Sequence, residues 1–320
     1  MTIIRKRFTH TLLPALLAAF AGFAACSSDD DGGGNGGTQL EWLEPIRVAS
    51  YNIQYDNSSD QDNKWTTRRD LLRQLLQSEK FDIFGAQEVL HAQLDDMLGA
   101  LDGYDYIGVG RDNGKKKGEY AAIFYKKDRI KLLNNGNFWL NETPEKPKLG
   151  WDAACIRICS WGEFEQAATG FRFYYFNLHM DHVGVVARRE AAKLVVKKIG
   201  EIAKGAPVVL TGDFNVDQND EIYGIFASSG ILNDSYTHAR LRFAENGTFN
   251  DFKPDVKTQS RIDHVFVSPE FNVDRYGMLT NMYWTDDAPT DNQKSNQAPT
   301  QLEFRKMTLR IPCLLYTSDA

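Results

Sequence analysis

Polar residues that can bind a metal ion or move a proton follow several apolar runs of this sequence. Asn52 closes IRVASYN, Glu88 closes FDIFGAQE, and Asp213 and Asn215 lie at the end of PVVLTGDFN. Because alternate residues of a strand share a side, Asp213 and Asn215 are expected to face one cavity where their strand runs out. An Asx turn that merely closes the strand explains this one pattern equally well.

Two further strand ends carry residues of the same kind. Asn177 and His179 share a face at the end of FRFYYFNLHM, and Asp263 stands just before the apolar run of SRIDHVFVS. Each residue alone is explained by a cap or by a satisfied buried polar group. Strand ends of this kind at five places in one domain favour a shared site.

Short β-rich runs alternate with helical segments and would position these residues. Apolar or alternating letters predict strands at 46–52, 81–88, 104–110, 120–126, 155–161, 171–180, 207–215 and 260–268. Helical periodicity predicts helices at 66–80 and 184–203, and a further helix is expected at 92–101. No linker divides the two halves, so we expect one domain from about residue 44 onward.

The N-terminal segment 1–25 has the pattern of an export signal. Three basic residues precede the apolar run LLPALLAAFAGFAA, which is too short to span a bilayer comfortably. Cys26 after FAA resembles the lipidated cysteine of bacterial lipoproteins, although Phe23 replaces the usual aliphatic residue. The acidic, Gly-rich segment 26–43 predicts a flexible tether. We therefore expect an exported protein that is anchored to the outer membrane through Cys26 and displayed at the cell surface.

Composition and charge limit the classes of function. The 320 residues include 42% apolar and 25% charged residues, which is ordinary for a soluble α/β domain. The formal net charge is −6, and it would become −9 without segment 1–25, which holds three basic and no acidic residues. An acidic protein gains no long-range attraction to a polyanion, so nucleic acid is an open but disfavoured substrate. The four cysteines show no zinc-type spacing, which excludes cysteine chemistry as the function.

Six short motifs stand in a fixed order: SYNIQ, FGAQEV, GRDNGKKKGE, FNLHMDH, LTGDFN and SRIDHVFV. Together they resemble the endonuclease/exonuclease/phosphatase superfamily, whose fold is that of deoxyribonuclease I. The resemblance implies a four-layer α/β sandwich in which two face-to-face mixed β-sheets are flanked by helices. It also implies a phosphoester hydrolase that depends on Mg²⁺, with Mn²⁺ as an alternative ion.

The resemblance assigns a role to each residue at the strand ends. Glu88 and Asn52 would bind Mg²⁺, a hard ion that takes one or two carboxylates and otherwise water and phosphate oxygens. Asp213 and Asn215 would orient the attacking water and hydrogen-bond the phosphoryl oxygens.

The leaving-group side of the implied site involves a histidine. His179 would stabilise or protonate the departing group, with Glu119 of KKKGEY as its carboxylate partner, and Asn177 is counted with the catalytic residues. Asp263 would orient a second histidine, the general base of the family.

That second histidine belongs to a last family motif, Ser-Asp-His-x-Pro, which this chain lacks. His264 gives the nearest letters, but it stands in the strand that follows the aspartate motif. The match holds through Pro312 and ends at Cys313. We therefore expect residues 44–312 to be a C-terminally incomplete domain and residues 313–320 to be a non-native tail.

The segment GVGRDNGKKKG predicts a mobile loop in which Arg111 would meet an anionic substrate; a solvated run of charges explains it equally well.

The leading hypothesis is hydrolysis of a phosphodiester by in-line attack of water, with nucleic acid, sphingolipid and inositol phosphate substrates left open. The competing hypotheses are a surface-displayed binding lipoprotein that keeps the fold without catalysis, and an inactive fragment of the enzyme. No protein partner is expected.

Overall fold

The computed structural model describes residues 2–6, 45–57, 64–243, 246–250, 258–279 and 313–315. Cys26 and the predicted tether lie outside these residues, so the lipid anchor stays a prediction. Within the described residues, no helix combines the length and the apolar character needed to cross a membrane.

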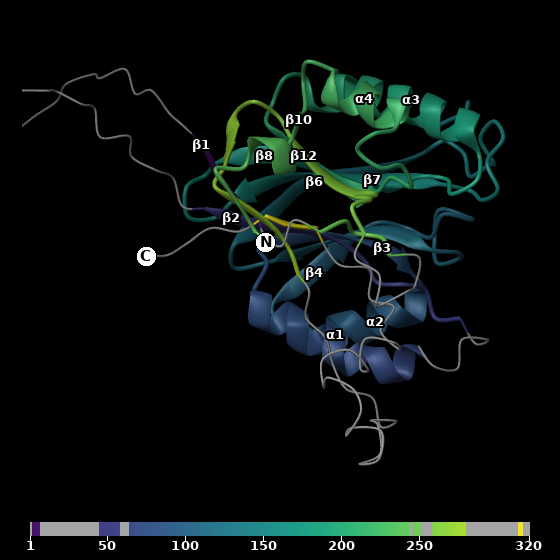
Figure 1. The fold of residues 1–320 in the computed structure, drawn as a ribbon. Helices are drawn as coiled ribbons and strands as arrows, with labels where there is room; N and C mark the ends of the chain where they lie inside the picture. Colours follow the sequence, from purple (N-terminus) through teal and green to yellow (C-terminus); the bar gives the residue numbers. More distant parts are fainter. Residues whose placement is uncertain are drawn as a thin grey trace, which may run out of the picture.

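Helices cover the two outer faces of the molecule (Figure 1). In chain order they are α1 (Trp65–Glu79), α2 (His91–Ala100), α3 (Val185–Ala203), α4 (Glu221–Ala227) and the short α5 (Ser235–His238). Figure 1 shows α1 and α2 on one side of two stacked sheets, and α3 and α4 on the other side. The layers are therefore helix, sheet, sheet and helix, which is the sandwich that the family resemblance implies.

The first sheet contains the strands that end in Asn52 and near Glu88. Its strands lie in the order β11 (Leu241–Phe243), β14 (Arg275–Met278), β15 (Cys313–Leu315), β2 (Ile46–Asn52), β3 (Ile83–Val89), β5 (Tyr120–Lys126) and β4 (Tyr104–Ile107), with β1 (Thr2–Lys6) and β13 (Phe271–Val273) off this path. β2 and β3 run parallel with Asn52 opposite Gln87. Asn52 and Glu88 consequently lie at the same edge of this sheet.

The second sheet contains the other predicted site residues. Its strands lie in the order β10 (Asn233–Asp234), β12 (Asp263–Val267), β9 (Val208–Asp213), β8 (Arg172–His179), β7 (Ile158–Gln166) and β6 (Ile130–Trp139). Parallel pairing of β8 with β9 places His179 opposite Asp213, and antiparallel pairing of β9 with β12 places Asp263 opposite Asp213. Three predicted residues are thus neighbours in register.

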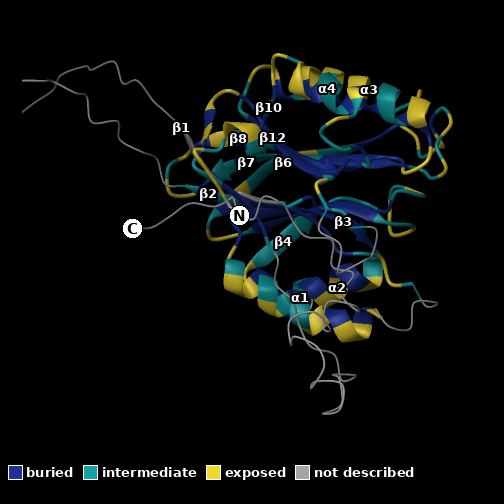
Figure 2. Ribbon diagram, viewed as in Figure 1, coloured by how far each residue is buried: buried dark blue, intermediate teal, exposed yellow. Residues whose placement is uncertain are grey.

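Alternate residues of the central strands point into different layers of the core. Val48 and Tyr175 pack between the two sheets, whereas Ala49 packs toward α1 and α2 and Phe176 toward α3 and α4. Figure 2 shows buried residues along the central strands and exposed residues on the outward faces of the helices. Because these strands are buried on both faces, they read in the sequence as short apolar runs.

Strands from both ends of the chain join the first sheet. β1 pairs with β2 and β13, and β15 lies between β14 and β2. β1 falls in the segment predicted to be an export signal, and β15 falls in the predicted non-native tail. These pairings do not test the cleavage of the signal or the origin of the tail, so both stay predictions.

One predicted strand begins later than expected. β7 begins at Ile158, so Cys155 lies in the preceding loop and not in a strand with Cys159. The backbone N–H groups of Ala154 and Cys155 donate to the carboxylate of Asp181 instead of to a neighbouring strand. This tertiary contact, which the alternation of letters does not reveal, overrides the strand-like pattern.

Candidate active site

The polar ends of the two sheets meet at one amide group. Asn52 donates from Nδ2 to Glu88 Oε1 at 2.8 Å and to Asp213 Oδ2 at 2.9 Å, and both hydrogen bonds are buried. Glu88 belongs to the first sheet and Asp213 to the second. A single side chain thus holds together two carboxylates that the fold brings from separate layers.

Glu88 owes its position to an irregularity in β3. The pairing of β3 with β5 shifts between Ala86 and Val89, and Glu88 has φ of 62°, in the left-handed region. Such a conformation costs a non-glycine residue on the order of 1–3 kcal/mol and is often found at functional sites. The bulge re-aims the side chain, and Oε2 accepts the backbone N–H of Tyr55 at 3.1 Å. Local strain therefore positions this carboxylate.

Asp213 is fully buried and stands at the start of a turn. Its Oδ1 accepts the backbone N–H of Asn215 at 3.0 Å, and Asn215 Nδ2 donates to the carbonyl of Met180 at 3.0 Å. Asn215 also has a left-handed φ, of 51°. The Asx turn that the sequence allowed is therefore present, and Asp213 still directs Oδ2 toward Asn52.

His179 lies between two carboxylates. Its Nε2 is 3.7 Å from Asp213 Oδ2, and its Nδ1 is 3.8 Å from Glu119 Oε2. These separations exceed hydrogen-bond length, but a protonated imidazole would still interact strongly with both carboxylates. Burial raises the pKa of Glu119, and the guanidinium of Arg111 opposes that rise. His179 therefore lies next to Glu119, its predicted carboxylate partner, and the catalytic role of this pair stays a prediction.

Arg111 is held inside the protein. Its guanidinium donates two hydrogen bonds of 2.7 Å to Glu119, and its side chain is only 13% exposed. The backbone around it is fixed as well, because Trp139 Nε1 donates to the Arg111 carbonyl at 2.7 Å. The structure shows a turn here in which Arg111 holds Glu119, and the predicted mobility of the loop stays a prediction. A direct contact of Arg111 with substrate stays a prediction.

Asn177 lies between the sheets. Its Nδ2 donates to the carbonyls of Ala86 and Ala122, and its Oδ1 accepts from Gln87 Nε2 and Thr211 Oγ1. These four bonds use the full hydrogen-bonding capacity of the amide. The observed contacts join the two sheets beneath the carboxylates, and a direct catalytic role for Asn177 stays a prediction.

Asp263 and His264 point to opposite sides of the second sheet. Asp263 is 1% exposed and faces the same side as Asp213, its partner in register. His264 is completely buried against Phe214 and Phe266, and its Nε2 donates to the carbonyl of Val216 at 2.9 Å. His264 thus belongs to the core under α4, on the face of the sheet opposite to Asp213.

A comparison with known families decides the relationship of the chain. The model of the endonuclease/exonuclease/phosphatase family matches residues 49–281. The chain belongs to this family.

Solved structures and curated relatives agree with the family assignment. A family member from Bacteroides thetaiotaomicron is 48% identical, with a TM-score of 0.75 over 84% of this chain and 96% of that chain. A mannosyl-6-phosphatase of the same organism is also 48% identical, with a TM-score of 0.75 over 85% of this chain and all of that chain. An uncharacterized mimivirus protein is 30% identical over 164 residues. The chain spans 60% of that viral relative and 28% of a yeast exoribonuclease subunit that it also matches.

Members of this family typically use a divalent metal, and the residues at the site fit one. Ligand atoms of Glu88, His179 and Asp213 all lie within 4.8 Å of one another. Carboxylate oxygens suit Mg²⁺ and Mn²⁺, and an oxygen that accepts one hydrogen bond keeps a second lone pair. Asn52 turns its amide nitrogen to the carboxylates, while its Oδ1 accepts the N–H of Gln54 at 3.0 Å. Asn52 therefore positions the carboxylates, and its predicted role as a ligand stays a prediction.

Two residues to which the sequence assigned no role support the site from behind. Arg68 on α1 is 1% exposed and donates to the carbonyls of Ile53 and Gln54, in the loop that follows Asn52. A charged residue on the buried face of an amphipathic helix was the available signal. Gln87, which bonds Asn177, gave no signal because a polar letter at a strand end reads as a cap.

We expect His264, which is buried in the second sheet, to make the folded protein less stable in acid. Burial lowers the pKa of His264 to about 4, from 6.5 for an exposed histidine. As pH falls from about 6.5 to 4, His264 becomes protonated in the unfolded chain but stays neutral in the folded chain. The free energy of unfolding should therefore fall by about 3 kcal/mol over this range and then level off. Urea unfolding at pH 7 and pH 4 measures this change.

The matched variant for this measurement is His264→Gln, whose amide can still donate to the Val216 carbonyl and does not titrate. We expect the wild type to lose more stability between the two pH values than this variant. Equal losses would show that His264 does not contribute to the acid sensitivity.

Proposed function

We propose that this protein is a divalent-metal-dependent phosphatase that hydrolyses a phosphate monoester of a sugar. The observation that carries the proposal is the meeting of Glu88, His179 and Asp213 from two sheets within 4.8 Å. The choice of a sugar monoester follows from the 48% identity to a mannosyl-6-phosphatase over that whole chain. The sequence favoured a phosphodiester, and that class is the second candidate in the experiment below.

Electrostatics support the need for a cation. Glu88 and Asp213 converge on the side chain of Asn52, and the chain as a whole carries a formal charge of −6. A phosphate would be repelled from this cluster. A bound divalent ion would reverse the local field, neutralise charge on the phosphoryl oxygens and polarise the phosphorus.

The residues of the chain divide the remaining work. Asp213, whose Oδ1 is held by the Asn215 N–H, would accept a proton of the attacking water through Oδ2 and so orient it. Glu119 faces Nδ1 of His179, so Nε2 is the nitrogen turned toward the site. From Nε2, His179 would deliver a proton to the oxygen of the departing sugar.

The test is a substrate and metal panel. Purified protein is incubated with a mannoside 6-phosphate and with bis(p-nitrophenyl) phosphate, in Mg²⁺, in Mn²⁺ and in EDTA. We expect release of inorganic phosphate from the sugar ester, loss of that activity in EDTA and its return when the metal is restored.

Two results would overturn the proposal. Faster cleavage of the diester would move the function to the class favoured by the sequence. No metal-dependent hydrolysis of either substrate would favour a protein that keeps the fold without catalysis.

A further inference from the structure

A buried carboxylate fixes the loop that follows His179. Asp181 is 2% exposed and accepts the backbone N–H groups of Ala154, Cys155, Val183 and Gly184 at 2.8–3.1 Å. Burial acts to raise the pKa of Asp181, but these four donors lower it to about 2. The group is therefore charged at every physiological pH, and it ties the loop after β8 to the loop before β7.

A buried arginine completes this arrangement. Arg157 is 5% exposed, and its Nε lies 3.4 Å from Asp181 Oδ2 while its Nη2 lies 3.0 Å from His182 Nδ1. A small cavity is lined by Arg157 together with His179 and Glu119. Arg157 therefore lines the same cavity as the candidate proton donor and also contacts the exposed imidazole of His182.

The contact with Arg157 determines which nitrogen of His182 carries the proton. A guanidinium can only donate hydrogen bonds, so Nδ1 of His182 is the acceptor. In the neutral ring the proton is then on Nε2. His182 is exposed. The loop after β8 thus presents an oriented N–H donor beside Arg157, which lines the cavity together with His179.

A second metal site is the competing interpretation, because ligand atoms of Cys155, Asp181 and His182 lie within 4.8 Å of one another. The hydrogen bonds oppose it. The two oxygens of Asp181 already accept five donors, and the guanidinium of Arg157 contacts both Asp181 and His182. A cation would compete with these donors and would be repelled by the guanidinium. The cluster is therefore better suited to a ligand oxygen that accepts a hydrogen bond.

We propose that His182 is a specificity-determining residue that donates a hydrogen bond from Nε2 to a hydroxyl of the departing sugar, with Arg157 holding the ring in place. The inference rests on the proposed function. If His179 protonates the departing oxygen, the sugar lies on the side of His179. His182 stands three residues later, in the loop that follows β8, and Arg157 contacts His182 while it lines the same small cavity as His179.

The first experiment compares two leaving groups. We expect His182→Phe to lower kcat/KM for the sugar phosphate roughly threefold to tenfold, mainly through KM, which is the range for one hydrogen bond between neutral groups. Hydrolysis of p-nitrophenyl phosphate, whose leaving group has no sugar hydroxyl, should not change. His182→Gln, whose amide can donate from a similar position, should restore part of the loss.

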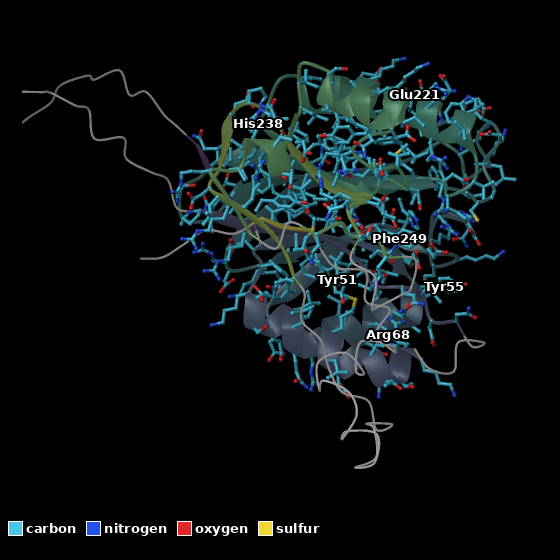
Figure 3. The ribbon with its side chains drawn as sticks, viewed as in Figure 1. Tyr51, Tyr55, Arg68, Glu221, His238 and Phe249 are labelled. Carbon is cyan, nitrogen blue, oxygen red and sulfur yellow. The ribbon has the colours of Figure 1, made fainter. Side chains whose placement is uncertain are left out.

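The matched control is His238→Phe. His238 is an exposed histidine, and Figure 3 shows it at the end of the sandwich opposite Tyr55, whose backbone contacts Glu88. This control should leave both substrates unaffected. A loss in His182→Phe that is equal for the sugar and aryl esters, or no loss at all, would overturn the inference.

The second experiment does not depend on activity. Spectra of ¹⁵N-labelled imidazoles in EDTA should show the proton of His182 on Nε2, and saturation-transfer spectra should show weaker binding of the unphosphorylated mannoside to His182→Phe. A proton on Nδ1, or unchanged sugar binding, contradicts the inference. If the wild type hydrolyses neither ester, the proposed function fails, while these spectra still decide the role of His182.

Discussion

Replacing Glu88 by glutamine will lower the rate of phosphoester hydrolysis by more than about 100-fold, since removing even a supporting contact around a metal ligand costs 10-fold to 100-fold. Glutamine keeps the shape and removes the charge. Asn52 can still donate to one side-chain oxygen, but the new amide N–H₂ faces the backbone N–H of Tyr55. We expect weaker binding of Mg²⁺ or Mn²⁺, measured by titration calorimetry, together with the loss of kcat/KM.

The control for this change is Glu221→Gln. Glu221 begins α4 on the outer surface, where Figure 3 labels it, and its carboxylate pairs with Arg189. The chemical change is the same, and activity and metal affinity should stay at the wild-type values. Full activity in Glu88→Gln, with normal unfolding in urea, would remove Glu88 from the metal site.

Replacing His179 by alanine will separate two kinds of substrate. Loss of a general acid costs roughly 10²-fold to 10⁴-fold when the leaving group needs a proton. A sugar alkoxide needs one, whereas p-nitrophenolate departs without it. We therefore expect a large fall in kcat for the sugar phosphate and a much smaller fall for p-nitrophenyl phosphate.

The contrast between substrates also tests the alternative role of His179. Its imidazole lies within 4.8 Å of the ligand atoms of Glu88 and Asp213, so it could instead help to hold the metal. In that case both substrates would lose the same factor, and metal affinity would fall. His238→Ala, which removes an exposed histidine elsewhere, should change neither quantity.

The framework of the sandwich could be predicted because its strands are buried on both faces. β2 and β5 begin and end at the predicted residues, and the helix expected at 184–203 is observed at Val185–Ala203. Burial on both faces leaves apolar runs with sharp ends. The strand predicted at 155–161 begins only at Ile158, because Ala154 and Cys155 donate hydrogen bonds to a distant carboxylate, which no local pattern encodes.

The candidate site was predictable where it depends on strand ends and not where it depends on loops. The structure brings Asn52, Glu88, His179 and Asp213 together as the ordered motifs indicate. The partner of Arg111 could not be read from its neighbours, because the guanidinium binds Glu119, which lies eight residues further along the chain. Long side chains in loops choose among many partners, and only the tertiary structure decides among them.

The bridge from Asn52 to Asp213, which are 161 positions apart, also has a thermodynamic consequence. Neither sheet alone contains the cluster, so a ligand that holds Glu88 and Asp213 recognises only the fully assembled molecule. Its binding free energy is then added to that of global unfolding, by about 2.7 kcal/mol at a hundredfold excess over Kd. The ion would act as a reversible cross-link between the two halves, and a chelator would loosen the entire protein and not one loop.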